Sequence, residues 1–343
     1  MRQKQWEFLR VVKIKIAVLY NVSKSKNTKE VESNLLDMAK SVAKALMLSG
    51  HRAILVNADD KLVSAIRKEK PDIVFNLAER FNGNSDFTPH VAALLEMHKI
   101  PFTGASSRCF TVCDDKIMAK VMMRHYGIKT PRFQVFESEK DRLSKVLKFP
   151  LIVKPCKTHD SIGITNDSVV YSRKQLRLRV KKIMDTLKQK VIVEEYIKGR
   201  EFNVTVLGNK KPYTLPICEV DFSKNSRKVL GYEMKWHIDW YKEAPIICPA
   251  NLPRGIESML KRTAINAHKK FKLRDYSRID VRLDENNKPY VLEINVNPGL
   301  TEDCFIFSSA KAAGIGYAKL IARVLGHAAE RYNIPTAVRI AAK

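Results

Sequence analysis

Two kinds of hydrophobic spacing alternate along the first hundred residues. Apolar residues recur at helical spacing across 31–46, and a second helix with Asp59 as its cap is expected over 59–69. Three near-continuous apolar runs separate and flank these helices, at 14–20, 53–57 and 71–78. Such runs are typical of strands that are buried on both faces of a parallel sheet. The strand–helix–strand order therefore predicts a small parallel sheet with covering helices over 13–105.

Short strands and helices are mixed through the rest of the chain. The segment 114–131 predicts a helix that begins at Asp114 and ends at Gly127, with Pro131 just beyond. Strands then surround one basic helix up to about residue 208, and strands alternate with longer helices after it. The length of 343 residues suits two or three packed units. We expect a mixed α/β (α+β) protein with units at 13–105, 106–208 and 209–335.

The charge balance is strongly basic, with 62 Lys and Arg against 36 Asp and Glu and a net charge of +26. Such a surface attracts polyanions, which suggests a nucleic acid or a nucleotide. A solvated surface that is rich in lysine explains the same net charge. The basic residues are spread along the whole chain, and no Arg-rich block interleaved with aromatics stands out. We favour the second interpretation and do not expect a nucleic-acid partner.

Cysteine spacing and hydropathy indicate a cytoplasmic protein. The six cysteines form no C-x-x-C pair, so neither a zinc ribbon nor a disulfide framework is predicted. No apolar run approaches the ~20 residues of a membrane span. Lys13 and Lys15 interrupt the apolar run near the start, which argues against a cleaved secretion signal.

The stretch "RIDVRLDENNKPYVLEIN" predicts a β-hairpin that carries unusual residues. A two-residue turn at Asn286–Asn287 would place Asp280 opposite Glu293 and Arg278 opposite Asn295. Residues two apart on a strand share a face, so all four side chains would project together.

Two directly opposed carboxylates repel each other unless a cation lies between them. Carboxylate and amide oxygens are ligands that Mg²⁺ prefers, and Mg²⁺ often shares its shell with phosphate. The hairpin is therefore a candidate metal–phosphate site with Arg278 beside it. A solvent-facing hairpin with a salt bridge explains the same residues equally well.

Two upstream segments carry polar residues that suit a nucleotide. Lys154 ends an apolar strand and precedes a polar loop, which is a candidate phosphate cradle but matches no Walker loop. An ordinary β-turn explains that loop better when it is taken alone. Glu194, Glu195 and Glu201 stand in apolar strands. Exposed faces explain one or two of them, and a base and ribose at a strand edge would explain all three as hydrogen-bond acceptors.

Taken in order, these motifs resemble the ATP-grasp superfamily and are most similar to the D-alanine–D-alanine ligase family. The similarity spans about 13–331 and rests on "CDDKIMAKVMMRHYGIKTP", "FPLIVKP", "VIVEEYIKGREFNV", "ICPANLP", "SRIDVRLDENNKPYVLEINVNPGL" and "SSAKAAGIGYAKLIARVL". It implies a preATP domain, a central lid domain and a C-terminal metal-binding domain, with ATP between the last two. It further implies an ATP-dependent carboxylate–amine ligase that forms an amide through an acyl phosphate. Small amino-acid or peptide substrates and a homodimer are implied as well.

The resemblance also implies roles for individual residues. ATP would be bound by Lys116 and Lys154 at the phosphates, by the hinge residues Glu194, Glu195, Tyr196 and Ile197 at the adenine, and by Glu201 at the ribose. Mg²⁺ or Mn²⁺ would be bound by Asp280, Glu293 and Asn295. The catalytic groups would be Arg278, Ser161 in the phosphate-covering loop, Lys235 in the ω-loop and the backbone of Gly299.

The chain departs from the family on the amino-acid side. Its phosphate-covering loop reads His-Asp-Ser at 159–161 instead of Gly-Ser-Ser, and Trp236 replaces a tyrosine. Cys304-Phe305 replaces the Ser-Leu pair that binds a substrate carboxylate. The Gly-Gly-x-Ser segment near the start is missing, and either Glu30 or Glu32 is the candidate substitute for its glutamate. D-alanine is therefore not assigned as the substrate, and a basic nucleotide- or nucleic-acid-binding protein without ligase activity is the alternative hypothesis.

Overall fold

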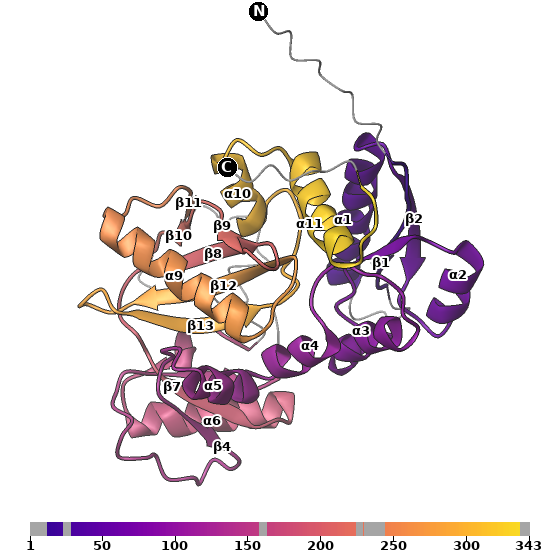
Figure 1. Ribbon diagram of the computed structural model, residues 1–343. Helices are drawn as coiled ribbons and strands as arrows, with labels where there is room; N and C mark the ends of the chain where they lie inside the picture. Colours follow the sequence, from indigo (N-terminus) through magenta and orange to yellow (C-terminus); the bar gives the residue numbers. More distant parts are fainter. Residues whose placement is uncertain (1–11, 23–28, 158–162, 224–228, 230–243, 337–343) are drawn as a thin grey trace, which may run out of the picture.

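The computed structural model describes residues 12–22, 29–157, 163–223, 229 and 244–336. These residues form three sheets with their covering helices (Figure 1). Within these ranges, no helix is both long and apolar enough to cross a membrane.

The N-terminal sheet is parallel, as the apolar runs predicted, with strand order β2-β1-β3. Its elements are β1 (Lys15–Tyr20), α1 (Lys29–Leu48), β2 (Arg52–Asn57), α2 (Leu62–Glu69), β3 (Ile73–Asn76) and α3 (Thr88–Met97). The middle strand β1 is buried along most of its length. Asp59 does not cap α2 directly, because its side chain accepts a hydrogen bond from Lys61 N, one residue before the helix begins.

The helix predicted from Asp114 to Gly127 is α5 (Lys116–His125), and a separate helix, α4 (Ser107–Asp114), directly precedes it. Asp115, not Asp114, caps α5, because its Oδ1 accepts hydrogen bonds from the backbone N–H groups of Ile117 and Met118. Lys116 is therefore the first residue of α5, and Asp114 is the last residue of α4.

The central sheet is antiparallel, with order β4-β7-β5-β6. Its elements are β4 (Phe133–Phe136), β5 (Leu151–Pro155), β6 (Val169–Val170), α6 (Arg173–Leu187) and β7 (Val191–Glu195). Leu176, Val180 and Ile183 of α6 pack on the buried face of this sheet. The central sheet and α6 thus enclose a core of their own.

The C-terminal sheet has the order β11-β10-β8-β12-β13, and β9 pairs with β8. Its strands are β8 (Glu201–Leu207), β9 (Tyr213–Thr214), β10 (Cys218–Val220), β11 (Ile246–Ile247), β12 (Tyr276–Leu283) and β13 (Pro289–Asn295). Its helices are α9 (Arg254–Lys270), α10 (Phe305–Ala312) and α11 (Tyr317–Arg331). Helix α11 lies beside α1 (Figure 1), and residues of both helices share one hydrophobic core with β1.

Buried polar contacts also join the N-terminal and C-terminal sheets. Asp275 is fully buried and accepts hydrogen bonds from Gly104 N and Arg331 Nη2, each at 2.7 Å. Asn297 accepts from Ala105 N at 2.9 Å. Gly104 has φ +87°, and a Cβ there would lie 2.3 Å from Asn297 Oδ1, so a side chain has no room. These two sheets form one body, whereas the central sheet has a separate core.

Candidate active site

The predicted pairing across the β12–β13 hairpin is confirmed at the site. Arg278 faces Asn295, and Asp280 faces Glu293. The turn itself differs from the prediction. Asp284 N donates to Lys288 O, which leaves a three-residue loop.

A β-bulge at Leu292 removes the one-residue offset that this loop creates. Val281 faces Val291, whereas its neighbour Asp280 faces Glu293, so β13 holds one extra residue between them. The longer turn and the bulge cancel, which is why the simple two-residue turn gave the correct pairing at the carboxylates.

Asp280 is the centre of a polar ladder that runs across β8, β12 and β13. It accepts hydrogen bonds from Asn203 Nδ2 at 2.6 Å on β8 and from Asn295 Nδ2 at 3.0 Å on β13. Arg278 Nε and Nη2 donate to its two oxygens at 2.8 and 3.0 Å. Burial opposes the charge on Arg278, but Asp280 outweighs it and raises the pKa of the guanidinium. Arg278 is therefore a fixed cation beside the two carboxylates.

Arg282, which sequence reasoning missed, extends the ladder toward the hinge. Its Nη2 lies 3.0 Å from Glu201 Oε2, and its Nη1 donates to Ile197 O at 3.1 Å. Its guanidinium carbon lies 5.0 Å from the centre of the Tyr196 ring. One signal was present in the sequence, because 278, 280 and 282 alternate on one strand face. Arg282 thereby fixes the positions of Glu201 and the hinge backbone.

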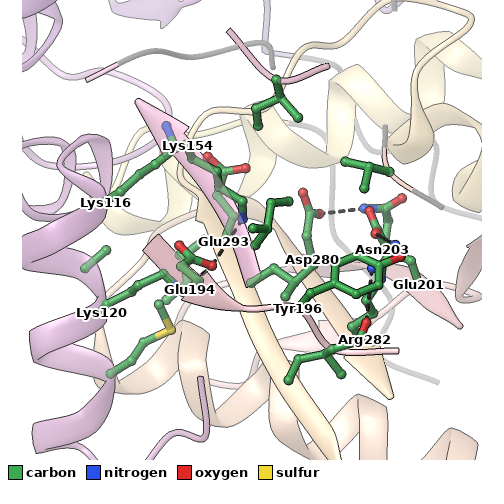
Figure 2. Close-up of a pocket in the computed structure, with 18 of the residues that line it drawn as sticks. Lys116, Lys120, Lys154, Glu194, Tyr196, Glu201, Asn203, Asp280, Arg282 and Glu293 are labelled. Carbon is green, nitrogen blue, oxygen red and sulfur yellow. Dashed lines mark hydrogen bonds and ion pairs between the residues drawn. The ribbon is translucent and has the colours of Figure 1, made fainter. Parts of the chain in front are cut away.

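Glu194 is fully buried between two lysines (Figure 2). Its Oε2 lies 3.3 Å from Lys120 Nζ and 3.2 Å from Lys154 Nζ. Burial alone would raise the pKa of Glu194, but the two ammonium groups outweigh it and hold that pKa below its usual value. Burial lowers the pKa of Lys120 to about 8. Sequence reasoning missed Lys120, although it lies one helical turn after Lys116.

One oxygen of Glu194 still has room for a partner. Its buried Oε1 accepts no hydrogen bond within the described part of the chain. An acceptor left in this state is costly, so a ligand that carries an N–H group would relieve it. The neighbouring Glu195 behaves differently, because its side chain pairs with Arg132. The carboxylate of Glu195 is therefore already paired, and its backbone is the candidate contact for a ligand.

A cavity of about 110 Å³ separates the central sheet from the polar ladder. Figure 2 shows that the labelled side chains of both sheets converge on it. Most of the residues predicted to bind ATP or metal line it: Lys116, Lys154, Glu194, Glu195, Tyr196, Ile197, Glu201, Asp280 and Glu293.

A second cavity of about 260 Å³ adjoins the first and shares Lys116, Arg278 and Glu293 with it. Asn295 and Gly299 line this second cavity, and a Cβ at Gly299 would meet no atom within 4 Å. Ser161 and Lys235, the other two predicted catalytic residues, lie outside the described residues.

Cys304 has a structural position next to the site. It is the N-cap of α10, where its Sγ accepts a hydrogen bond from Phe307 N at 3.4 Å. Burial raises the pKa of the thiol to about 11, which leaves little thiolate at neutral pH. Phe305, the next residue, lies under the guanidinium of Arg278 at 5.3 Å. The Cys304-Phe305 pair thus caps a helix and supports Arg278.

The donor set of the ladder fits a hard divalent cation. Asp280 and Glu293 supply carboxylate oxygens from directly opposed positions, and Asn295 supplies an amide beside them. Among the described residues, no group of three or more His, Cys, Asp or Glu side chains forms a candidate metal site. A soft-metal centre built from thiolates and imidazoles is therefore not found in that part of the chain.

The two antiparallel sheets with a charged cavity between them, attached to a parallel N-terminal sheet, define an ATP-grasp protein. A crystal structure of the D-alanine–D-alanine ligase from Bacillus anthracis complexed with ATP superposes with a TM-score of 0.72, covering 93% of this chain and 99% of that one at 22% identity. The family model for the D-Ala–D-Ala ligase C-terminus matches residues 122–326. This chain belongs to the D-alanine–D-alanine ligase family.

Two curated relatives show how far the similarity extends. The D-alanine–D-alanine ligase of Aquifex aeolicus is 32% identical over 84% of this chain and 94% of its own length. An uncharacterized protein of Sinorhizobium fredii, y4sG, is 35% identical over 86% of this chain and 88% of its own length.

Proposed function

We propose that the protein is an ATP-dependent carboxylate–amine ligase that forms an amide bond through an acyl phosphate. The observation that carries the proposal is the pairing of Asp280 with Glu293 beside the lysine-lined cavity that ends at Glu194. This cavity has opposed carboxylates at one end and paired lysines at the other. Such an arrangement suits a bound metal–triphosphate. Family membership supports the same conclusion.

The proposed position of ATP follows from the polar groups of the first cavity. The adenine amino group would donate to Glu194 Oε1, which lacks a partner among the described residues. Glu201, held by Arg282, would accept from the ribose hydroxyls. Lys116 and Lys154 would bind the phosphates.

Asp280, Glu293 and Asn295 would hold Mg²⁺ or Mn²⁺ at the phosphate end. The bound cation would offset the negative charge of the phosphate oxygens. Asn295 donates to Asp280 through Nδ2, so its Oδ1 would serve as the metal ligand. Asp280 would remain paired with Arg278.

The second cavity would receive the carboxylate substrate. A free carboxylate is a poor electrophile, so its oxygen first attacks the γ-phosphoryl group and ADP leaves. An amine then attacks the acyl carbon, and phosphate leaves as the amide forms. Arg278 faces both cavities and would neutralise the charge that grows on the transferred phosphoryl group. Holding both reactants in one cavity supplies the proximity that the second step needs.

The proposed substrates are small amino acids or peptides. The curated relatives act on D-alanine by name, and the second cavity of this chain is lined by Glu79 and Arg80. A homodimer is part of the proposal on family grounds, and a cytoplasmic location is part of it because of the cysteine spacing. The alternative of a binding protein without catalysis has less support, because binding alone has no need for the opposed carboxylates.

The test is phosphate release from ATP and Mg²⁺ with a panel of amino acids and dipeptides of both configurations. Hydroxylamine is added to trap any acyl phosphate as a hydroxamate. We expect phosphate release and a hydroxamate with at least one carboxylate. If no member of the panel gives either product, the ligase proposal is wrong. Oligonucleotide binding that weakens steeply with salt, without ATP turnover, would support the alternative instead.

A further inference from the structure

Asp114 lies in a position that fold stability does not explain. It is the last residue of α4, where the helix dipole disfavours a negative charge. It lines the second cavity, and Glu293, another acidic residue, lines the same cavity. No described residue donates a hydrogen bond to its carboxylate. A carboxylate with these surroundings is more stable when a cation reaches it.

The electrostatics of Asp114 support that conclusion. Burial raises the pKa of Asp114 to about 7, although the nearby Lys116 acts in the opposite direction. Glu293 adds to the increase. Lys116 alone therefore does not return the pKa of Asp114 to its ordinary value.

The rest of the second cavity suits a small zwitterion. Arg80 and Lys157 add positive charge to its wall, and Glu79 adds negative charge. The remaining lining combines apolar residues such as Phe110, Val296 and Pro298 with the polar side chains of Ser85, Thr88 and Asn297. Charges of both signs in one cavity match the ammonium and carboxylate groups of an amino acid better than a simple carboxylic acid.

We propose that Asp114 binds the ammonium group of the amino acid whose carboxylate is activated. Asp114 and Lys116 are two residues apart at the junction of α4 and α5. An ammonium group on Asp114 leaves the carboxylate of a small amino acid directed toward Lys116 and Arg278, where the phosphoryl group is transferred. Asp114 thereby selects amino acids over acids that lack the amine. This inference rests on the proposed function.

The experiment compares the wild-type protein with Asp114→Asn. Glycine, L-alanine and D-alanine are the amino-acid probes, and acetate and propionate are the matched acids without an amine. Binding is measured by NMR saturation transfer and by calorimetry, with Mg²⁺ and a non-hydrolysable ATP analogue present. Hydroxamate formation gives the KM of each probe separately.

We expect Asp114→Asn to weaken the binding of the preferred amino acid at least tenfold, because an ion-paired hydrogen bond is lost. The affinity for acetate, propionate and the nucleotide should not change. Asp114→Glu, which keeps the charge, should retain most of the amino-acid affinity. The control is Asp86→Asn, which removes the same charge from an exposed residue beside the cavity-lining Ser85. This control should behave as the wild type.

Three results would overturn the inference. The first is an equal amino-acid affinity in Asp114→Asn and the wild type. The second is an equal loss of affinity for acids with and without the amine. The third is that no amino acid binds to the wild type. Asp114-dependent binding without hydroxamate refutes the ligase proposal and leaves only the binding of the ammonium group by Asp114. Hydroxamate formation that is unchanged in Asp114→Asn refutes the role of Asp114 and supports the ligase proposal. Because the substitution removes a charge that opposes the α4 dipole, the melting temperature should not fall, which excludes misfolding as the cause.

Discussion

The substitution Glu293→Gln separates the proposed metal-binding role of this residue from any structural role. Glu293 faces Asp280 across the hairpin and lines both cavities. Glutamine keeps the shape and removes one negative charge. We expect turnover to be lost and the fold to be retained.

The size of the stability change follows from the charges around the hairpin. Two carboxylates ~5 Å apart repel by roughly 3 kcal/mol at an effective dielectric constant of 20 and by about 0.8 kcal/mol in water. Arg278, paired with Asp280, offsets part of that repulsion. Glu293→Gln should therefore change the free energy of unfolding by less than about 1 kcal/mol. Asp280→Asn, in contrast, leaves the buried Arg278 without its partner and should cost about 3 kcal/mol.

The assay is thermal unfolding with and without Mg²⁺ and ATP, alongside phosphate release. At a ligand concentration 100 times its Kd, binding stabilises a protein by about 2.7 kcal/mol. The wild type should show a gain of this size, and Glu293→Gln should lose the part that depends on Mg²⁺. Turnover within tenfold of the wild type would show that Glu293 is not a metal ligand. Destabilisation of the ligand-free protein beyond about 2 kcal/mol would refute the electrostatic argument.

Three further predictions concern the lysines and the helix cap. Lys154→Met should raise the KM for ATP at least tenfold, because it removes a proposed phosphate-binding cation while Glu194 keeps its ion pair with Lys120. Steady-state kinetics measures this KM. The pKa of Lys120 is about 8 in the folded protein and 10.5 for an ordinary lysine. Between these pH values the unfolded chain binds one more proton than the folded protein. The free energy of unfolding should therefore rise with pH across this range. This rise, about 3 kcal/mol from pH 8 to 10.5, should be absent in Lys120→Met when the two are compared by urea unfolding. Cys304→Ser should keep the N-cap of α10 and change the free energy of unfolding by less than about 1 kcal/mol. It should also remove a thiol that iodoacetamide alkylates slowly in the folded wild type.

Local patterns were sufficient for the N-terminal sheet and for the hairpin face. Near-continuous apolar runs are typical of parallel strands; β1 is buried along most of its length, whereas β2 at the edge of the sheet is only partly buried. At the hairpin, Arg278 and Asp280 share a face whatever the turn, because strand side chains alternate. The pairing with Glu293 required more. A longer turn and a bulge at Leu292 cancelled each other, and nothing in the local pattern indicates either one.

The residues that sequence reasoning missed are those fixed by contacts distant in the chain. Asn203 supports Asp280 only because β8 pairs with β12, more than seventy residues later. Lys120 lies on a helix face that appears polar until the central sheet places Glu194 against it. At the α4–α5 junction, Asp114 and Asp115 are equally good caps by composition. The break between the two helices makes Asp115 the cap of α5 and places Asp114 in the wall of the second cavity.

The division of cores bears on how the site would close. Asp280, a proposed metal ligand, and Arg282, which pairs with the proposed ribose acid Glu201 of β8, lie two residues apart on β12, a spacing of about 7 Å. Glu194 and Lys154 belong to the central sheet, which has its own core. Any rotation of that sheet therefore carries the lysine and the base-binding acid together and leaves the metal ligands behind. The hydrogen bond from Arg282 to Ile197 O joins the two bodies.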